Sequence, residues 1–229
     1  MPLKLTVPPC AEPFVAATDA SLRQHLRLDC GDNSQDVLIG LFIGHARETA
    51  EHQCCRAFIT QSWLMTLDKF PSPSLETSSA NWYGPAWGVG PGPLTMVKPD
   101  GKTQFEITIP LPPLQTVDAI KYYDQSGAYL ILDPSLYLVD AVSEPARITP
   151  SYGTSWPATL NRINAVEVHF TAGYDDTGEL LPQAIRAWML MRIADLYENR
   201  DAVVMGTRGT VESHPFIDRL LDPYRIKVY

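Results

Sequence analysis

Two segments with helical periodicity, far apart in the sequence, constrain the fold of this chain more than any other feature. Residues 35–56 and residues 182–199 both repeat apolar or small side chains at steps of three and four, the period of an α-helix. Each helix then has a wide face that must be buried, and neither has another helical neighbour of comparable length. We therefore expect the two helices to pack against each other.

The residues expected on these buried faces can be read from the same spacing. The face of the first helix is predicted to hold Val37, Leu38, Leu41, Phe42, His45, Ala46 and Thr49. The second helix has two neighbouring stripes, one of Ala184, Ala187, Met191, Ala194 and Glu198, the other of Ile185, Trp188, Met189, Arg192 and Leu196. A shorter helix is expected before them, over DASLRQHLRL, with Thr18 as its N-cap.

The stretch between the two long helices has the period of β-strands instead. Phe105, Ile107 and Ile109 alternate with polar residues, and Val166 to Phe170 does the same. The predicted fold class is α+β, with an antiparallel helical core built from the N- and C-terminal helices and an inserted antiparallel β domain. Residues 1–57 plus 180–229 are expected to form the helical core, and residues 58–179 the insertion.

Charge and cysteine content exclude some classes of protein. The net charge is −8, and residues 58–179 hold thirteen acidic and six basic side chains, which disfavours a protein that reads DNA through its phosphates. No run of about 18 apolar residues is present, so no membrane span is expected. The N-terminus lacks the apolar region of a signal peptide, so we expect a chain kept in the cytoplasm. The spacing of the four cysteines is typical of free thiols.

Two groups of side chains have residue types that bind metals. His45, Glu48 and His52 share one helix face, but the partner helix has no histidine to complete a di-metal site. Asp175, with its neighbour Asp176 and Glu179, could bind calcium, although acidic turns before a helix usually serve as caps. No nucleophile, phosphate-binding or dinucleotide motif occurs. We therefore expect no metal, no cofactor and no enzymatic activity.

A long segment rich in proline and glycine, residues 71–102, interrupts the β pattern and contains Trp82, Tyr83 and Trp87. Aromatic side chains on a loop can contact a partner protein or stack on a sugar. They can equally fold back over the edge of their own sheet. The three residues are candidate contacts, and these alternatives stay open.

Five segments in order resemble the head–tail connector (adaptor) proteins of tailed phages, a family also found in prophages and gene transfer agents. They are KLTVPPCAEPFVAATDASLRQHLRLD with VLIGLFIGHARETAEHQCCRAFITQSW, then IPLPPLQTVDAIKYYDQSGAYLIL, ARITPSYGTSWPATLNRINAVEVHFTAGY, LPQAIRAWMLMRIADLYENRDAV and LLDPYRIKVY. Together they cover nearly the whole chain. Residues 71–102 are longer than the family pattern predicts.

The resemblance implies a structural virion protein that forms a ring, usually of twelve copies, under the portal and joins the DNA-filled head to the tail. It implies a portal protein and a stopper or tail-terminator protein as partners, and genomic DNA that passes without sequence-specific binding. It places the chain at the head–tail interface of the virion, and in the host cytoplasm during assembly. The C-terminal segment reaches the portal in such proteins, so the candidate contacts are Pro223, Tyr224, Arg225, Ile226, Lys227, Val228 and Tyr229. The alternative function is a carbohydrate- or receptor-binding β module of a virion.

Overall fold

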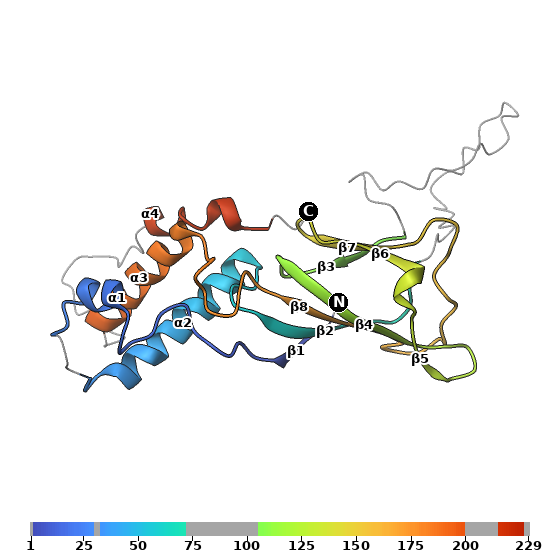
Figure 1. Ribbon diagram of the computed structural model, residues 1–229, viewed down its shortest axis with the longest axis horizontal. Coiled ribbons are helices and arrows are strands. Elements are labelled where there is room, and N and C mark those ends of the chain that lie inside the picture. The colour runs from blue at the N-terminus through green and yellow to red at the C-terminus, as the bar shows by residue number, and fades with distance from the viewer. Residues whose placement is uncertain (1, 30–32, 72–104, 200–214, 227–229) are drawn as a thin grey trace, which may run out of the picture.

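The computed structural model places the helices at one end of an elongated molecule and the sheets at the other (Figure 1). It describes residues 2–29, 33–71, 105–199 and 215–226. The helical part contains α1 (Ala20–His25), α2 (Asp36–Cys54), α3 (Gln183–Glu198) and the short α4 (Pro215–Asp218). No helix in these ranges is both long enough and apolar enough to cross a membrane.

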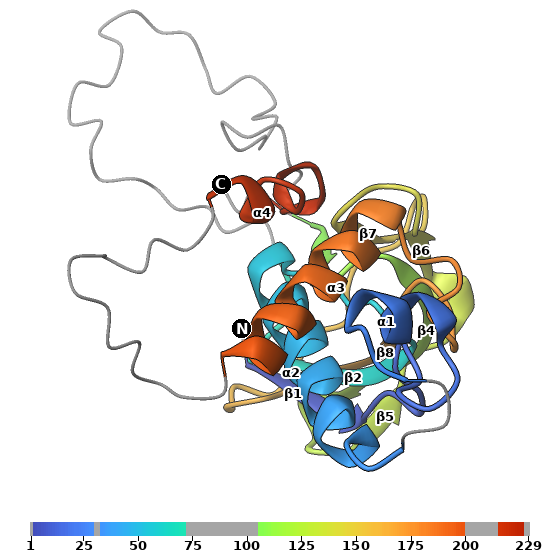
Figure 2. The same cartoon turned by 90° about the vertical axis from the view of Figure 1, so that its left-hand side faces the viewer.

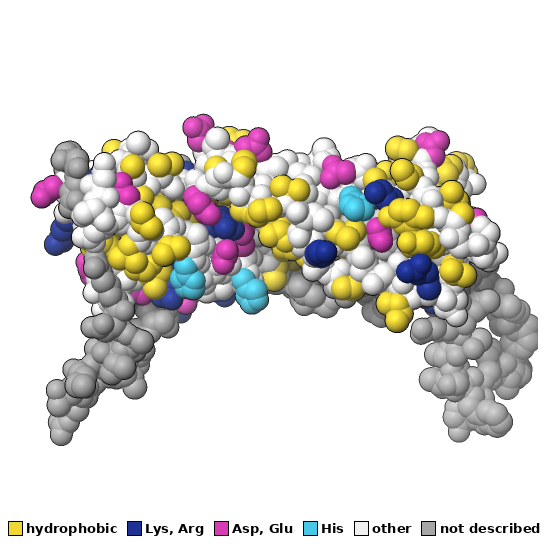
Figure 3. Space-filling model, turned by 90° about the horizontal axis from the view of Figure 1, so that it is seen from below, with side chains coloured by type: hydrophobic (Ala, Val, Ile, Leu, Met, Phe, Trp, Pro, Cys, Tyr) yellow, Lys and Arg dark blue, Asp and Glu magenta, His cyan; other side chains and the backbone are white. Residues whose placement is uncertain are grey.

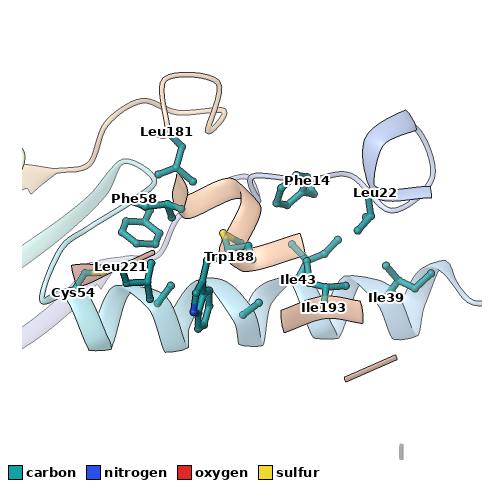
Figure 4. Close-up of a cluster of buried hydrophobic side chains, with 14 of the residues drawn as sticks. Phe14, Leu22, Ile39, Ile43, Cys54, Phe58, Leu181, Trp188, Ile193 and Leu221 are labelled. Carbon is teal, nitrogen blue, oxygen red and sulfur yellow. The ribbon is translucent and has the colours of Figure 1, made fainter. Parts of the chain in front are cut away.

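The two long helices pack against each other, which confirms the main expectation from the sequence. Seen from the helical end, α1, α2 and α3 lie together in front of the sheets (Figure 2). Their shared core contains Ile39 and Ile43 from α2 and Trp188 and Ile193 from α3 (Figure 4). Leu22 of α1 completes it, fully buried. Segments on both sides of the β region therefore build one hydrophobic core.

The predicted buried face of α2 was wrong in part. Val37 and Leu41 are 83% and 67% exposed, and His45 is exposed too. The core instead takes the adjacent stripe, Ile39, Ile43, Ala46, Ala50 and Cys54. The physical reason is that α2 is apolar around much of its circumference in its first two turns, so spacing alone leaves two faces possible.

The buried face of α3 follows the second predicted stripe more closely. Ile185, Trp188 and Met189 are buried as expected, while Ile193 takes the place predicted for Arg192. Ala187, from the other stripe, is exposed.

The helix N-cap in the N-terminal part also differs from its prediction. The α1 helix is capped by Asp19, not Thr18: its Oδ1 accepts hydrogen bonds from the backbone N–H groups of Ser21 (3.0 Å) and Leu22 (3.1 Å).

Two antiparallel sheets form the other end of the molecule. The larger sheet has the strand order β1-β2-β8-β4-β5, with bounds Leu3–Val7, Gln61–Leu67, Val166–Ala172, Leu114–Tyr123 and Tyr129–Ile131. The smaller sheet has the order β3-β7-β6, with bounds Ile107–Ile109, Ala146–Pro150 and Tyr137–Asp140. A 3-10 helix, η1 (Pro134–Leu136), leads into β6. The inner faces of the two sheets enclose a second core.

The alternation predicted for the segments around Ile107 and Val166 is confirmed in β3 and β8. Val166, Val168 and Phe170 of β8 are fully buried, and the residues between them are only partly covered. Ile107 and Ile109 are buried in β3, but Phe105 precedes the strand and is 40% exposed.

The N-terminal strand was not expected. Residues Leu3–Val7 form β1, which pairs with β2 in antiparallel register, Leu5 opposite Trp63. The first residues of the chain therefore belong to the larger sheet, although residues 1–57 as a whole were assigned to the helical core. The division at residues 57 and 180 stays a prediction.

Backbone hydrogen bonds join the helical part to the sheets. The N–H of Thr60 donates to the carbonyl oxygen of Asp175 (2.9 Å), and the N–H of Tyr174 donates to that of Phe58 (3.0 Å). Gly173, at the end of β8, has φ = +140° and lies directly against the backbone of Ile59 and Thr60. The chain passes from α2 into β2 and from β8 towards α3 through this crossing.

Candidate assembly surfaces

The C-terminal segment folds back onto the end of α2. After α4, Leu221 is buried in the helical core, and the 3-10 helix η2 (Asp222–Tyr224) follows. The N–H of Ile226 donates to the carbonyl oxygen of Cys54 (3.0 Å), and Arg225 donates to Oε1 of Gln53 (3.3 Å). The segment therefore satisfies the carbonyl group of Cys54, which the end of a helix otherwise leaves without a partner.

Arg56 connects this segment to the sheet end of the molecule. Its side chain is nearly buried, and Nε donates to the carbonyl oxygen of Tyr224. Nη2 of the same guanidinium donates to the carboxylate of Glu144, in the turn between β6 and β7. One side chain thus holds the C-terminal segment and a loop of the smaller sheet at the end of α2.

A second buried arginine binds the N-terminal segment to α2. Arg47 donates from Nε to Glu12 (2.8 Å) and from Nη1 to Glu51 (2.6 Å). The other oxygen of Glu51 accepts from the N–H of Phe58 (2.7 Å) and from the amide of Gln61 (2.8 Å). Burial raises the pKa of the Glu51 carboxyl, and the hydrogen bonds from Arg47, Phe58 and Gln61 oppose that rise.

The structure places the predicted portal-contact residues in two groups. Pro223 and Arg225 are exposed, while Tyr224 and Ile226 are partly buried against the end of α2. Lys227, Val228 and Tyr229 lie outside the described residues, as do the candidate loop contacts Trp82, Tyr83 and Trp87. The described part of the C-terminal segment is thus an intramolecular strap with an exposed outer side. The carbohydrate-binding alternative, which depends on the loop aromatics, stays a prediction.

The acidic turn before α3 is closed by Asp175, but it does not cap the helix, because α3 begins at Gln183 without a side-chain N-cap bond. The two carboxylate oxygens of Asp175 accept from the N–H of Gly178 (2.9 Å), the N–H of Glu179 (2.9 Å) and the hydroxyl of Thr177 (2.8 Å). These bonds lower the pKa of Asp175 against the opposing effect of burial. On α2, His45, Glu48 and His52 are all exposed. Within the described ranges, no three His, Cys, Asp or Glu side chains gather as metal ligands.

Exposed apolar side chains occur on both ends of the molecule. The helical end exposes Val37 and Leu41. Hydrophobic side chains gather on the face of the helical end that is seen from below in Figure 3. The sheet end exposes Ile131, Leu138, Val142, Tyr152 and Ile163. Single exposed apolar residues are ordinary, but apolar residues grouped on one helix face indicate contact with another protein.

The cysteines yield a test of the fold at the end of α2. Cys10 and Cys55 are exposed free thiols, whereas Cys54 is buried and burial raises its pKa to about 11. In the native protein at neutral pH, we expect iodoacetamide to modify Cys54 about a hundredfold or more slowly than Cys55, because the thiolate is the reactive form. Peptide mass spectrometry of a time course measures both rates. Equal rates would contradict the packing of the C-terminal segment over Cys54.

Comparison with known proteins identifies the fold. No protein-family model matches the sequence, and no curated protein matches it. A solved structure described as the neck of an empty gene transfer agent (GTA) particle, computed with C6 symmetry, contains a chain with 20% identity and a TM-score of 0.66. The alignment covers 100% of this chain and 98% of that one. The chain has the fold of a GTA neck chain.

Two further solved structures agree. A chain in the virion of a native GTA particle matches at 19% identity with a TM-score of 0.66, again over 100% of this chain and 98% of the other. A chain in the neck of a native GTA particle, computed with C12 symmetry, matches at 19% identity with a TM-score of 0.60 over the same shares. The α+β fold predicted from the sequence is therefore also the fold of chains in these particles.

Sequence reasoning missed the two arginines that organise the ends of α2. Arg47 and Arg56 have ordinary sequence surroundings, and their partners Glu12, Glu144 and Tyr224 are distant in the chain. One signal was available: Arg47 lies between Ala46 and Ala50 on an apolar helix face, and a charge there requires a buried partner.

Proposed function

We propose that this chain is a structural neck protein of a tailed-phage-like or GTA-like particle. In this proposal it acts as the connector (adaptor) between the portal of the DNA-filled head and the tail. The observation that supports it most is the match to GTA neck chains along the full length of both chains, with a TM-score of 0.66. The proposed role is structural and non-enzymatic.

We propose further that the chain forms a homo-oligomeric ring of twelve copies. The support is that the necks containing chains of this fold were computed with C12 and C6 symmetry. A ring around a channel lets genomic DNA pass without sequence-specific binding, and the net charge of −8 opposes tight binding of phosphates. The proposed protein partners are the portal on one side and a stopper or tail-terminator protein on the other. The proposed location is the virion, and the host cytoplasm during assembly.

Electron microscopy tests the proposal directly. Purified full-length chain is mixed with portal rings from the same particle, and the complexes are imaged and averaged. The expected result is a ring of this chain on the tail side of the portal. Portal rings that remain bare at every concentration of the chain, or that carry single copies without rotational symmetry, would contradict the proposal.

Two truncations test the C-terminal segment as the portal contact. The strap up to Ile226 is tied to α2, so deletion of residues 227–229 is expected to leave the melting temperature unchanged and to weaken portal binding at least tenfold. Deletion of residues 222–229 also removes the carbonyl acceptor of Arg56, so it is expected to lower the melting temperature as well. Thermal unfolding and portal pull-down separate the two effects. Unchanged portal binding after both deletions would remove the segment from the proposed interface.

A further inference from the structure

The outer face of α2 is apolar, exposed and unused by the fold of its own chain. Val37 and Leu41 are 83% and 67% exposed, and Gly40 between them is exposed too. By helical geometry this face points away from Ile39 and Ile43, which fill the core. Figure 3, a view from below, shows hydrophobic side chains gathered on the helical end of the molecule.

Two glycines on this helix have no explanation within the chain. Gly40 and Gly44 lie one turn apart in the interior of α2, where glycine destabilises a helix relative to alanine. A Cβ added at Gly40 would meet no atom within 4 Å, and one added at Gly44 would meet only a carboxylate oxygen of Glu12 at 3.7 Å. The fold therefore has room for alanine at both positions. Gly44 faces Glu12 of its own chain, whereas Gly40 faces open space, so the missing Cβ at Gly40 leaves room for close approach by an element of another chain.

A different surface of the same helical part complements this face. An open hollow lies between α1 and α3, lined by Ser21, Gln24, His25 and Leu190. The outer face of α2 has the opposite shape: Val37 and Leu41 project from its first turns as a ridge, and His45 and Glu48, both exposed, follow them on the same face. A projecting helix face suits an open hollow in shape, and Leu190 in the lining of the hollow gives Val37 and Leu41 an apolar contact.

We infer that the outer face of α2 docks against the α1–α3 hollow of a second copy of this chain. The inference rests on the proposed function, because it assigns the subunit contact of the proposed ring. The two surfaces belong to different helices and are not self-complementary, so each copy can offer its ridge to one neighbour and its hollow to the other. Contacts of this head-to-tail kind close into a ring when the rotation between neighbouring copies divides a full turn evenly. The C12 and C6 symmetry of the necks that contain this fold supports a second copy as the occupant.

The substitution Gly40→Ala tests the inference through two effects of opposite sign. Alanine is the better helix former and meets open space, so the melting temperature of the chain at low concentration should rise by about 2–4 °C. The added methyl group separates the docked surfaces, so self-association should weaken several-fold. Differential scanning fluorimetry and sedimentation velocity over a concentration series measure the two effects. Gly127→Ala, in the turn between β4 and β5, is the control: its positive φ makes alanine unfavourable, so it should lower the melting temperature without changing association. A Gly40→Ala chain that associates like the wild type overturns the inference.

The substitution Leu41→Ser removes the centre of the ridge, with Leu180→Ser as the matched control. Both leucines are exposed, at 67% and 71%, but Leu180 lies in the turn before α3. Leu41→Ser is expected to weaken self-association about tenfold or more and to leave incomplete rings on the portal, while Leu180→Ser does neither. If Leu41→Ser loses portal binding but keeps its self-association, the face binds the portal and the inference fails. If the wild type forms portal rings that Leu41→Ser leaves intact, the inference fails and the proposed function stands. A wild type that forms no ring, alone or on the portal, overturns both.

Discussion

Replacing Arg47 by methionine is expected to lower the free energy of unfolding by roughly 3–5 kcal/mol, as the removal of one member of a buried ion pair does. The Arg47 side chain is 7% exposed and that of Glu51 is 13% exposed. Methionine fills a similar volume but leaves the Glu51 carboxylate buried beside an apolar group. The substitution also releases Glu12 and with it the N-terminal segment that Arg47 holds against α2. Urea unfolding followed by circular dichroism measures the loss.

The loss of stability in Arg47→Met should depend on pH. The pKa of Glu51 decides whether the loss grows or shrinks as the pH rises. Burial already raises the pKa of the Glu51 carboxyl in the wild type, and removal of Arg47 raises it further. A carboxyl whose pKa is higher in the folded state than in the unfolded state stabilises the fold below its unfolded pKa. That stability is lost as the pH rises through the folded pKa. Arg47→Met should therefore be less destabilising at pH 5 than at pH 8.

Two variants control this experiment. Glu48→Gln removes an exposed carboxylate 3.6 Å from the same guanidinium, and it should change stability by less than about 0.5 kcal/mol. The double variant Arg47→Met with Glu51→Gln should recover part of the loss, because the amide keeps an acceptor for the N–H of Phe58 and has no charge. A loss below about 1 kcal/mol for Arg47→Met alone, or no recovery in the double variant, would show that the network does not stabilise the fold.

Gly173→Ala is expected to cost roughly 3–5 kcal/mol, because it combines backbone strain with overpacking. A Cβ at this position would lie 2.6 Å from the carbonyl carbon and oxygen of Ile59 and from the nitrogen of Thr60. These are backbone atoms held by the hydrogen bonds between Phe58 and Tyr174 and between Thr60 and Asp175, so they cannot move aside without breaking the crossing between helices and sheets. The value φ = +140° adds strain for any residue with a side chain.

Gly127→Ala is the matched control for this prediction. Gly127 also has a positive φ, +85°, but a Cβ there meets no atom within 4 Å. Its cost should be about 1–2 kcal/mol, the strain of the left-handed conformation alone. Urea unfolding of both variants measures the difference. Equal costs would mean that the close approach at Gly173 contributes nothing to stability.

The sequence predicts the fold class well because its strongest signals are long. The pairing of α2 with α3 follows from two extended apolar patterns, and the strand period of β8 follows from Val166, Val168 and Phe170. Which face of α2 is buried could not be predicted, because Val37 and Leu41 are as apolar as Ile39 and Ile43. Burial is decided by partners on α1 and α3 that periodicity does not specify.

The candidate surfaces were harder to predict than the fold. The strand β1 has only five residues and gains its structure from pairing with β2, which follows it by more than fifty residues. The fold-back of Tyr224 and Ile226 depends on single hydrogen bonds to Arg56 and Cys54, which leave no periodic trace in the sequence. Contacts of this kind are specified by tertiary structure and become visible only when the chain is folded.

The order of elements along the chain has a consequence for synthesis on the ribosome. The α2 helix ends at Cys54 and α3 begins at Gln183. The face of α2 that holds Ile39 and Ile43 therefore leaves the ribosome long before the helix that covers it. At typical elongation speeds this delay lasts roughly ten seconds. During that time the nascent helix exposes two apolar faces, one waiting for its own chain and one for a neighbouring subunit. A chaperone that binds short apolar helices would find its target here in the unfinished polypeptide.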